Sequence, residues 1–234
     1  MSKPFRIVQL NEKVFSLIFE EKLTLNTSAL KTFFEAQFSA LEEITTTFNR
    51  INLIFKDEVL IASLNEKLSD FTVEDFHRKT TTFYWEIPIC LALQYTEDLQ
   101  SCFEGQPKNF NNYLKTFLAT TFTLEFYGFL PGFGYLSGLP NALHLARKAN
   151  PNRLTKAGTV AVGGAQVGVY PQDSPGGWQG IGYCPVPWFS PQQTPPVFIQ
   201  QGDSIRFVEI DIKQSQSIAL AVEMGVYQPK KVQL

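Results

Sequence analysis

The sequence predicts an α+β domain followed by a mainly β domain that forms a barrel or a sandwich. Over residues 1–80, strand-like and helical patterns alternate in the order β, β, α, β, α. After Pro151, short apolar runs are separated by Gly, Pro, Asn and Asp, which is typical of an all-β domain. A hydrophobic share of 44% in 234 residues is enough for one large core or two small ones. We therefore expect domains at 1–80 and 81–234.

The N-terminal domain is expected to begin with a hairpin. Residues 5–10 and 14–19 are rich in β-branched and aromatic side chains and flank a polar connector at 11–13. A helix capped by Asn26 or Thr27 is predicted next, followed by a strand and a short helix. The apolar positions behind these predictions are Leu30, Phe33, Phe34, Leu41 and Ile44 for the first helix, Ile51, Leu53 and Phe55 for the strand, and Leu60, Leu64 and Leu68 for the second helix. Helices of this kind pack on a sheet.

The C-terminal domain is expected to begin near a strand over residues 80–89, which runs into Pro88. A helical pattern over 96–126 is interrupted by a break at 105–107, and a short helix is predicted at 141–149. The apolar runs that follow are predicted to be strands, namely 160–162, 198–199, 205–212 and 218–222.

Charge and composition restrict the possible partners. The net charge is −2 and the basic residues form no cluster, so we expect no nucleic-acid partner. The N-terminal residues lack the apolar region of a signal peptide, and the apolar run at 87–93 is too short for a membrane span, so a cytoplasmic protein without membrane contact is expected. Cys90, Cys102 and Cys184 lack metal-ligand spacing, and two histidines are too few for a histidine-rich site, so no metal is predicted.

Several common catalytic motifs are missing. The sequence has no Gly-x-x-x-x-Gly-Lys-Ser/Thr motif, and the glycines at 163–168 lie among strand-like residues, so neither a phosphate-binding loop nor a dinucleotide fingerprint is predicted. Ser137 lacks the Gly-x-Ser-x-Gly context, and no base can be assigned to Ser174. Any nucleotide would need another kind of site.

Glycine and aromatic residues are concentrated between residues 126 and 182, as in the wall and floor of a pocket. Arg147 can bind a carboxylate or phosphate with two hydrogen bonds, or it forms a surface ion pair instead. If residues 141–149 are helical, His144 shares a face with Arg147, where it joins the site or is a partly buried histidine. Gln166 can both donate and accept hydrogen bonds, which suits an amide or lactam.

The segment 174–178 offers a second anion site. It can turn successive backbone N–H groups toward one point beside an indole, or it is a plain tight turn with Trp178 in the core. The candidate residues of this segment and of the surrounding walls are Tyr135, Tyr170, Ser174, Gly176, Gly177 and Trp178.

Four motifs in the C-terminal domain give the sequence a family resemblance. They are Gly128-Phe-Leu-Pro-Gly-Phe-Gly-Tyr-Leu136, Ala157-Gly-Thr-Val-Ala-Val-Gly-Gly-Ala-Gln-Val-Gly-Val-Tyr-Pro171, Ser174-Pro-Gly-Gly-Trp178 and Gln201-Gly-Asp-Ser-Ile-Arg-Phe207. As an ordered set they resemble the PxpB/KipI family, the small subunits of bacterial ATP-dependent 5-oxoprolinase, also labelled allophanate hydrolase subunit 1. The N-terminal half matches only in its order of elements.

The resemblance implies a ferredoxin-like domain followed by a cyclophilin-like β-barrel. It also implies a larger PxpC/KipA-type partner and a PxpA-type protein, which together open 5-oxoproline to glutamate with ATP; phosphorylation of the amide oxygen is the expected use of ATP. The alternative is a KipI-like regulator that inhibits a sensor histidine kinase. Such a regulator would dock through its first domain, with Phe34, Phe38 and Phe48 exposed rather than in the core.

The chain departs from the family pattern at several positions, so we expect a divergent member. Gly134, Ala146 and Lys156 stand where the family usually has proline, Val167 replaces a threonine, and Phe117 stands where a histidine is common. Tyr183 and Cys184 follow the Ile-Gly pair, where threonine or arginine is usual. Loss of the threonine and the histidine is expected to remove polar groups from the pocket, whereas Arg147, Gln166 and the turn at 176–178 are retained.

Overall fold

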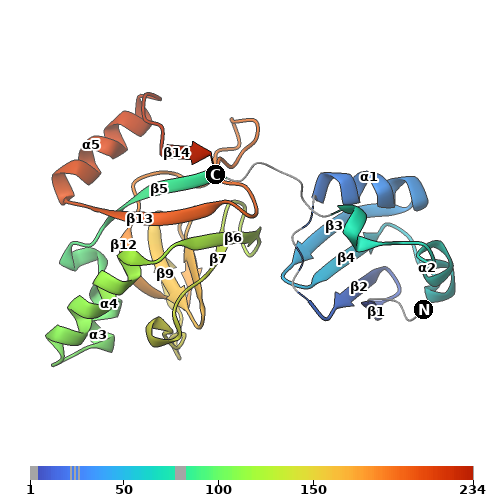
Figure 1. Ribbon diagram of the computed structural model, residues 1–234, viewed down its shortest axis with the longest axis horizontal. Coiled ribbons are helices and arrows are strands. Elements are labelled where there is room, and N and C mark those ends of the chain that lie inside the picture. The colour runs from blue at the N-terminus through green and yellow to red at the C-terminus, as the bar shows by residue number, and fades with distance from the viewer. Residues whose placement is uncertain (1–4, 22, 24, 26, 77–82, 234) are drawn as a thin grey trace. The chain divides into compact units, whose positions relative to one another are not determined.

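The computed structural model describes residues 5–21, 23, 25, 27–76 and 83–233. The chain divides after residue 80 into two compact units (Figure 1). The first unit contains a four-stranded sheet, and the second contains a larger sheet that closes on itself. Each unit has its own hydrophobic core, as expected for a domain.

The first unit is an antiparallel sheet with helices, in the strand order β1-β2-β4-β3. Its elements are β1 (Phe5–Asn11), β2 (Val14–Phe19), α1 (Thr27–Gln37), β3 (Leu41–Thr47), β4 (Arg50–Phe55), α2 (Ile61–Lys67) and a 3-10 turn (Val73–Phe76). The predicted hairpin is confirmed by the pairing of β1 with β2, which aligns Phe5 with Phe19. The strand predicted after the first helix is confirmed by β4, and the short helix predicted after that strand is confirmed by α2.

The first helix is shorter than its apolar spacing predicts. Helix α1 ends at Gln37, and Leu41 and Ile44 belong to strand β3 instead. The segment from Leu41 to Thr47 holds three threonines and pairs with β4, so β-branched side chains and sheet pairing outweigh the helical spacing. Of the two predicted cap residues, Thr27 is the first residue of α1, and Asn26 lies outside the described residues.

Phenylalanine rings hold the helix α1 on this sheet. Phe34 and Phe38 are buried, with exposed fractions of 0% and 5%. The Phe38 ring centroid lies 5.3 Å from that of Phe55 on β4 in an edge-to-face arrangement. Phe48 is half-buried. The first two rings are therefore core residues, not the exposed surface that a docking role would require.

The second unit is a closed barrel, which confirms the predicted barrel. Its sheet has the order β12-β9-β10-β7-β6-β13-β5-β14, and an additional pairing of β12 with β5 closes it. The strands are β5 (Phe83–Cys90), β6 (Phe122–Tyr127), β7 (Gly134–Ser137), β9 (Thr159–Gly163), β10 (Gln166–Val169), β12 (Gln179–Tyr183), β13 (Ser204–Ile210) and β14 (Lys230–Gln233). A separate two-stranded ribbon pairs β8 (Asn152–Thr155) with β11 (Ser174–Gly176).

The helices of the second unit differ in part from the prediction. The break at 105–107 is confirmed, since it separates α3 (Glu97–Cys102) from α4 (Pro107–Ala119). Residues 122–126, which the helical pattern includes, form β6 instead. The predicted helix at 141–149 is wrong, because only a 3-10 turn forms at Asn141–Leu143. Pro140 before it and Pro151 after it limit continuous helix here.

The predicted strand at 218–222 is also wrong. These residues belong to α5 (Ile212–Glu223), which begins with a capping box in which the Asp211 side chain accepts from the Gln214 backbone N–H and the Gln214 side chain accepts from the Asp211 N–H. Residues 198–199 form no strand. The short apolar run at 218–222 fits either a strand or a helix, and the capping box at Asp211 decides for the helix.

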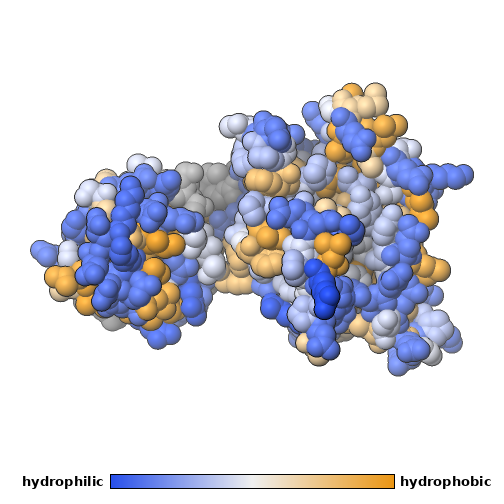
Figure 2. Space-filling model, turned by 180° about the vertical axis from the view of Figure 1, so that it is seen from behind, coloured by the Kyte–Doolittle hydropathy of each residue, from blue (hydrophilic) through white to orange (hydrophobic). Residues whose placement is uncertain are grey.

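The barrel core is filled by side chains from the strands and from α4. Phe117 on α4 lies with its ring centroid 5.1 Å from Phe122 on β6 and 5.4 Å from Phe207 on β13. Helix α5 packs on β5, but most of its residues are exposed or only half-buried. Figure 2 shows orange, hydrophobic residues where α5 ends, and the exposed hydrophobics there are Leu220, Met224 and Val226.

One buried carboxylate ties the barrel strands to the turn before β13. Asp203, 1% exposed, accepts hydrogen bonds from the Phe83 N–H (3.1 Å), the Trp85 indole (2.9 Å) and the Gln200 N–H (2.9 Å). Because each of its oxygens is used, this charge is compensated inside the fold. Within the described residues, no helix is both long enough and apolar enough to cross a membrane.

Candidate functional site

A pocket of about 330 Å³ lies on the second unit. This volume is within the range of roughly 300–1,000 Å³ that is typical of small-molecule sites. The pocket is lined mainly by aromatic rings and proline, together with two cationic side chains; the lining residues are Phe129, Phe133, Tyr135, Arg147, Lys148, Pro151, Tyr170, Pro175, Gly176, Gly177 and Trp178. The chemistry therefore suits a small ligand with a flat apolar body and a negative charge.

Phe133 is the centre of the aromatic wall. Its ring centroid lies 5.1 Å from Tyr135, 5.2 Å from Tyr170 and 5.4 Å from Trp178, with steep interplanar angles in each pair. The ring centroids of Tyr135 and Trp178 lie 5.7 Å apart, also in an edge-to-face arrangement. Edge-to-face packing of this kind fixes each ring by its neighbours, so the wall is rigid before a ligand arrives.

Two glycines allow these rings to lie directly on the barrel strands. A Cβ atom on Gly163 would lie 2.5 Å from the Trp178 indole, and one on Gly168 would lie 2.7 Å from the Phe133 ring. Real Cβ contacts essentially never come so close. The glycines of β9 and β10 are therefore required by the rings of the pocket, which explains why glycine and aromatic residues are concentrated in the same stretch.

Phe129 occupies an unusual backbone conformation at the pocket. Its φ is 65°, and it is the non-glycine residue with positive φ in the described part of the chain. The Leu130 N–H bonds to the Gly128 carbonyl at 2.7 Å, so Phe129 is the central residue of a tight γ-turn. Its ring is 62% exposed and meets Phe133 edge-on at 5.5 Å. The strained turn thus presents an aromatic ring to the pocket.

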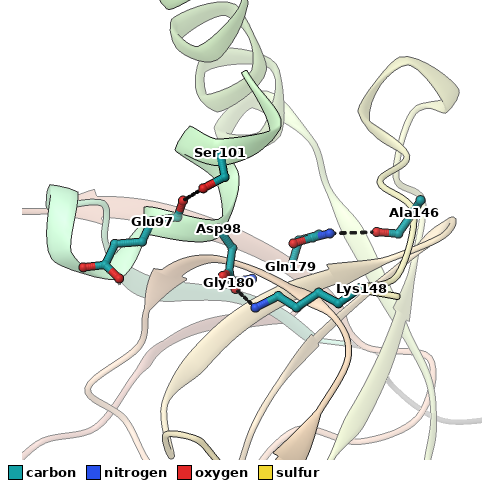
Figure 3. A network of polar contacts seen from close by, with 7 residues as sticks. All are labelled: Glu97, Asp98, Ser101, Ala146, Lys148, Gln179 and Gly180. Atoms are coloured by element: carbon teal, nitrogen blue, oxygen red, sulfur yellow. Dashed lines mark hydrogen bonds and ion pairs between the residues drawn. The ribbon is translucent and has the colours of Figure 1, made fainter. Parts of the chain in front are cut away.

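Arg147 is carried by a short segment that we call the strap, residues 146–148. The Ala146 carbonyl accepts from the Gln179 side-chain amide at 3.0 Å (Figure 3). The Lys148 N–H donates to the Gly177 carbonyl at 2.7 Å. The exposed Arg147 side chain between these anchors has its guanidinium carbon 5.5 Å from the Trp178 ring centroid, a cation–π contact. The strap therefore places a guanidinium beside the indole wall.

Lys148, the second cation of the lining, is paired. Its ammonium lies 2.5 Å from the Asp98 carboxylate, and only 13% of the lysine side chain is exposed. In Figure 3 Asp98 projects from α3 toward both Lys148 and the backbone of Gly180, whose N–H it also binds at 2.8 Å. This pair joins α3, the strap and β12.

The two tyrosines of the pocket remain protonated at neutral pH. Burial raises the pKa of Tyr135, and the charge of Arg147 opposes this shift. Burial also raises the pKa of Tyr170, although a hydrogen bond from the Trp178 backbone and the charge of Arg147 act in the other direction. Both phenols can therefore donate a hydrogen bond to a ligand.

The structure brings most of the predicted site residues together. Tyr135, Arg147, Tyr170, Gly176, Gly177 and Trp178 all line the pocket. The other three, His144, Gln166 and Ser174, do not line it. His144 is exposed on extended backbone and its ring contacts the Leu139 carbonyl at 3.2 Å, so the helical face that it was to share with Arg147 does not exist.

The remaining two lie elsewhere in the second unit. Gln166 begins β10 and pairs with Gly163 across the hairpin. Ser174 is 7% exposed and lies on β11 opposite Thr155. The predicted nest at 174–178 is a strand over Ser174–Gly176, and the Trp178 backbone is hydrogen bonded to the Tyr170 hydroxyl. A nest requires a curved backbone that turns successive N–H groups toward one point. Pairing with β8 keeps Ser174–Gly176 extended instead.

The family departures lie mostly outside the pocket. Phe117 and Val167 are both 0% exposed in the barrel core, and a Cβ on Gly134 would meet Leu124 and Trp188 there. Lys156 is on the surface, where it pairs with Asp173 at 2.8 Å. These changes therefore alter the core or the surface, and the loss of histidine and threonine takes no polar group from this pocket.

Several residues line the pocket that the sequence patterns did not predict, namely Phe129, Phe133, Lys148, Pro151 and Pro175. The signal was present for the two phenylalanines, since both lie in the glycine-rich motif around Pro131. For Lys148 there was no signal, because its partner Asp98 is fifty positions away in the sequence. The described residues contain no group of three or more His, Cys, Asp or Glu side chains placed to hold a metal ion.

Comparison with known proteins gives consistent matches. Residues 5–199 match the family described as carboxyltransferase domain, subdomain C and D. The B subunit of 5-oxoprolinase from Haemophilus influenzae is 34% identical over 163 residues, which cover 70% of this chain and 74% of that protein. The protein of the same name from Escherichia coli O157:H7 is 34% identical over 161 residues, covering 68% and 74%.

Solved structures share the fold. The crystal structure of TTHA0988 matches 85% of this chain with a TM-score of 0.68 and 25% identity, although this chain spans only 40% of it. The urea amidolyase of Kluyveromyces lactis matches 98% of this chain with a TM-score of 0.74, but at 13% identity and over 16% of its own length, so it shows the fold alone. With its match to residues 5–199 and its identity to two bacterial relatives over more than two thirds of its length, the chain belongs to the family of the 5-oxoprolinase B subunits, the PxpB family that its motifs resemble.

Proposed function

We propose that this chain is a subunit of an ATP-dependent amide or lactam hydrolase of the 5-oxoprolinase type and that it acts with a larger partner subunit. The names of the relatives support this assignment, since each relative is named as one subunit of an assembly. The observation that carries the proposal is Arg147, a guanidinium held against Trp178 at 5.5 Å in an aromatic pocket.

The pocket fits the two ends of a small cyclic amide acid. Tyr135 and Trp178 are the walls for a flat ring, and Arg147 binds the carboxylate. A charge-assisted hydrogen bond of this kind contributes about 1.5–3 kcal/mol, which is enough to fix the orientation of a small anion. The Tyr170 hydroxyl, beside Gly176 and Gly177, is the donor for the amide oxygen. His144, Gln166 and Ser174 have no place in this proposal because they do not line the pocket.

The proposal assigns ATP and the partners to the assembled complex. Hydrolysis of an unstrained lactam is poorly driven, and phosphorylation of the amide oxygen by ATP would activate it. The sequence contains no phosphate-binding loop, so the nucleotide is expected to bind with the help of a PxpC/KipA-type subunit and a PxpA-type protein. An enzyme that consumes ATP in this way is expected in the cytoplasm.

We also infer that the first unit is ferredoxin-like and the second cyclophilin-like. β2, α1, β3, β4 and α2 follow the β-α-β-β-α order of the ferredoxin-like fold. β1 pairs with β2 and takes the place of the last strand of that fold. The closed barrel supports the second assignment.

Reconstitution tests the proposed function. The chain is purified with a PxpC/KipA-type subunit and a PxpA-type protein, and ATP hydrolysis is measured with and without 5-oxoproline. We expect 5-oxoproline to stimulate ATP hydrolysis and to yield glutamate. Arg147→Ala should reduce turnover at least about tenfold, since about 1.4 kcal/mol corresponds to one decade. Arg153→Ala, which removes an exposed arginine outside the pocket, is the matched control and should leave turnover unchanged.

The results separate two kinds of failure. If the wild-type complex shows no response to 5-oxoproline, the proposed function is wrong. If it responds and Arg147→Ala turns over at the wild-type rate, only the role of Arg147 is wrong. The core positions of Phe34 and Phe38 remove the docking surface expected for the kinase-regulator alternative. Inhibition of a histidine kinase by the chain without any turnover would favour that alternative over the proposed function.

A further inference from the structure

Asp98 connects three elements behind the pocket. Its carboxylate oxygen Oδ2 lies 2.5 Å from the Lys148 ammonium and accepts the Gly180 N–H at 2.8 Å. The side chains of Lys148 and Asp98 are 13% and 29% exposed, so the pair is largely shielded from water. A shielded pair of this kind is costly to break from one side, because the remaining charge is then left without compensation.

The strap is therefore held on both of its outer residues. Ala146 and Lys148 bond to Gln179 and Gly177 through their backbones, and Lys148 bonds to Asp98 through its side chain. These anchors lie on either side of Arg147 in the chain and hold the backbone that carries its side chain. This arrangement leaves the side chain of Arg147 directed to Trp178.

The same pair sets the charge that the pocket offers. Of its two cationic lining residues, Lys148 is compensated by Asp98. Arg147 has no carboxylate within ion-pairing distance among the residues that the structure describes. Both Asp98 and Arg147 act on the titration of Tyr170, so both charges are felt inside the pocket. The pocket therefore presents one uncompensated positive charge.

We propose that Asp98 is a specificity-determining positioning residue: by neutralising Lys148 and holding the strap, it leaves Arg147 as the single free cation and makes the pocket select a ligand with one negative charge. This inference rests on the proposed function in so far as that function places an anionic substrate here. A dianion such as a dicarboxylate would bring a second charge into a site with one free cation, and that charge would be partly desolvated without a partner.

Asp98→Asn is the informative substitution. The asparagine has the same shape and can still accept the Gly180 N–H through its side-chain oxygen, so the hydrogen bond survives while the charge is removed. Glu97→Gln is the matched control, because the Glu97 carboxylate belongs to the same helix and points away from Lys148 in Figure 3. The double substitution Asp98→Asn with Lys148→Met removes both charges and restores the net charge of the wild-type pocket.

The first measurement reports the charge balance without a ligand. Cys102 at the end of α3 is exposed, whereas Cys90 and Cys184 are buried, so thiol titration of the folded chain reports Cys102. Burial raises the pKa of the Cys102 thiol, Asp98 raises it further, and Lys148 lowers it. Asp98→Asn should lower this pKa, measured by the pH dependence of reaction with a chromogenic disulfide, and Glu97→Gln should not. An unchanged pKa in Asp98→Asn overturns the proposed charge balance.

The second measurement is binding of two five-carbon acids to the full chain by calorimetry, 5-oxoproline with one carboxylate and glutarate with two. The wild-type chain should prefer 5-oxoproline, Asp98→Asn should shift the preference about tenfold toward glutarate, and the double variant should return it. Glu97→Gln should bind as the wild type does. A purely structural Asp98 predicts instead an unchanged preference, or weaker binding of both acids that the double variant does not restore.

Two further outcomes overturn the inference. One is a wild-type chain that binds glutarate as tightly as 5-oxoproline, and the other is a wild-type chain that binds neither acid, because the pocket is then no monoanion site. Neither measurement requires ATP turnover or a partner subunit. A reconstituted complex without oxoprolinase activity would therefore reject the proposed function while the role of Asp98 is still decided by these two experiments.

Discussion

Gly163→Ala tests whether the glycines of the barrel strands are needed by the pocket wall. The added Cβ would lie 2.5 Å from atoms of the Trp178 indole, whereas ordinary contacts begin at 3.4 Å. The ring would have to withdraw by roughly 1 Å, and it is held in place by Phe133 and Tyr135. Overpacking of this kind costs about 1–3 kcal/mol. Gly163 has no positive φ, so alanine also gains about 0.4–1 kcal/mol from a less flexible unfolded chain.

The net expectation for Gly163→Ala is a loss of about 1–2 kcal/mol in the free energy of unfolding of the second unit. All three tryptophans, Trp85, Trp178 and Trp188, lie in this unit, so their fluorescence during denaturant unfolding reports its stability alone. Gly177→Ala is the matched control from the same pocket. Its Cβ would find its nearest neighbour at 3.5 Å, so its stability should be unchanged or slightly higher.

A second background locates the source of the loss. If the indole is the obstacle, Gly163→Ala should cost little or nothing in a chain that already carries Trp178→Ala, because the two effects are then coupled. The reasoning is refuted if Gly163→Ala is as stable as the wild type. It is also refuted if the loss is the same in both backgrounds, since the strain would then arise elsewhere in the strand.

Two further predictions concern buried groups of the second unit. Asp203→Asn should lower the free energy of unfolding of the second unit by about 2–4 kcal/mol, because one amide oxygen cannot replace two carboxylate oxygens that serve three N–H donors. Tryptophan fluorescence during denaturant unfolding measures this loss. The control Asp173→Asn, at an exposed position, should change the stability little. Burial raises the pKa of the Cys184 thiol from 9.0 to about 11. Above pH 9 the thiol therefore loses its proton in the unfolded chain but keeps it in the folded one. As a result, the free energy of unfolding should fall by about 2–3 kcal/mol between pH 9 and pH 11. Cys184→Ala should show a shallower fall over this interval, and an identical pH profile in both proteins would contradict the assignment.

Local patterns in the sequence were sufficient where the structure depends on neighbouring residues. The β1–β2 hairpin follows from two apolar segments around a polar connector, and the break between α3 and α4 follows from glycine and proline. The same patterns failed at residues 41–47, where two apolar residues at helical spacing belong to a strand, and at 218–222, where a short apolar run fits both helix and strand. Pairing with β4 decided the first case, and the capping box at Asp211 decided the second.

The candidate site was predictable in its composition but not in its membership. Arg147, Tyr135 and Trp178 could be chosen because a guanidinium binds anions and aromatic rings form the walls of pockets. His144 and Gln166 are equally suitable by chemistry, yet neither of them lines the pocket. The isolated sequence does not exclude them, because the position of each residue depends on how the strands are paired in space.

The sequence by itself therefore determined a mainly β second domain, the glycine-rich aromatic pocket and the family, since each depends on residue types in a fixed local order. The pairing of β12 with β5 closes the sheet into a barrel. Tertiary structure alone decided that Asp98 neutralises Lys148, that Phe133 stands at the centre of the wall and that Gly163 must be glycine. These facts join residues far apart in the chain. The physical reason is that charge compensation and close packing act through distances in space, which the order of residues does not contain.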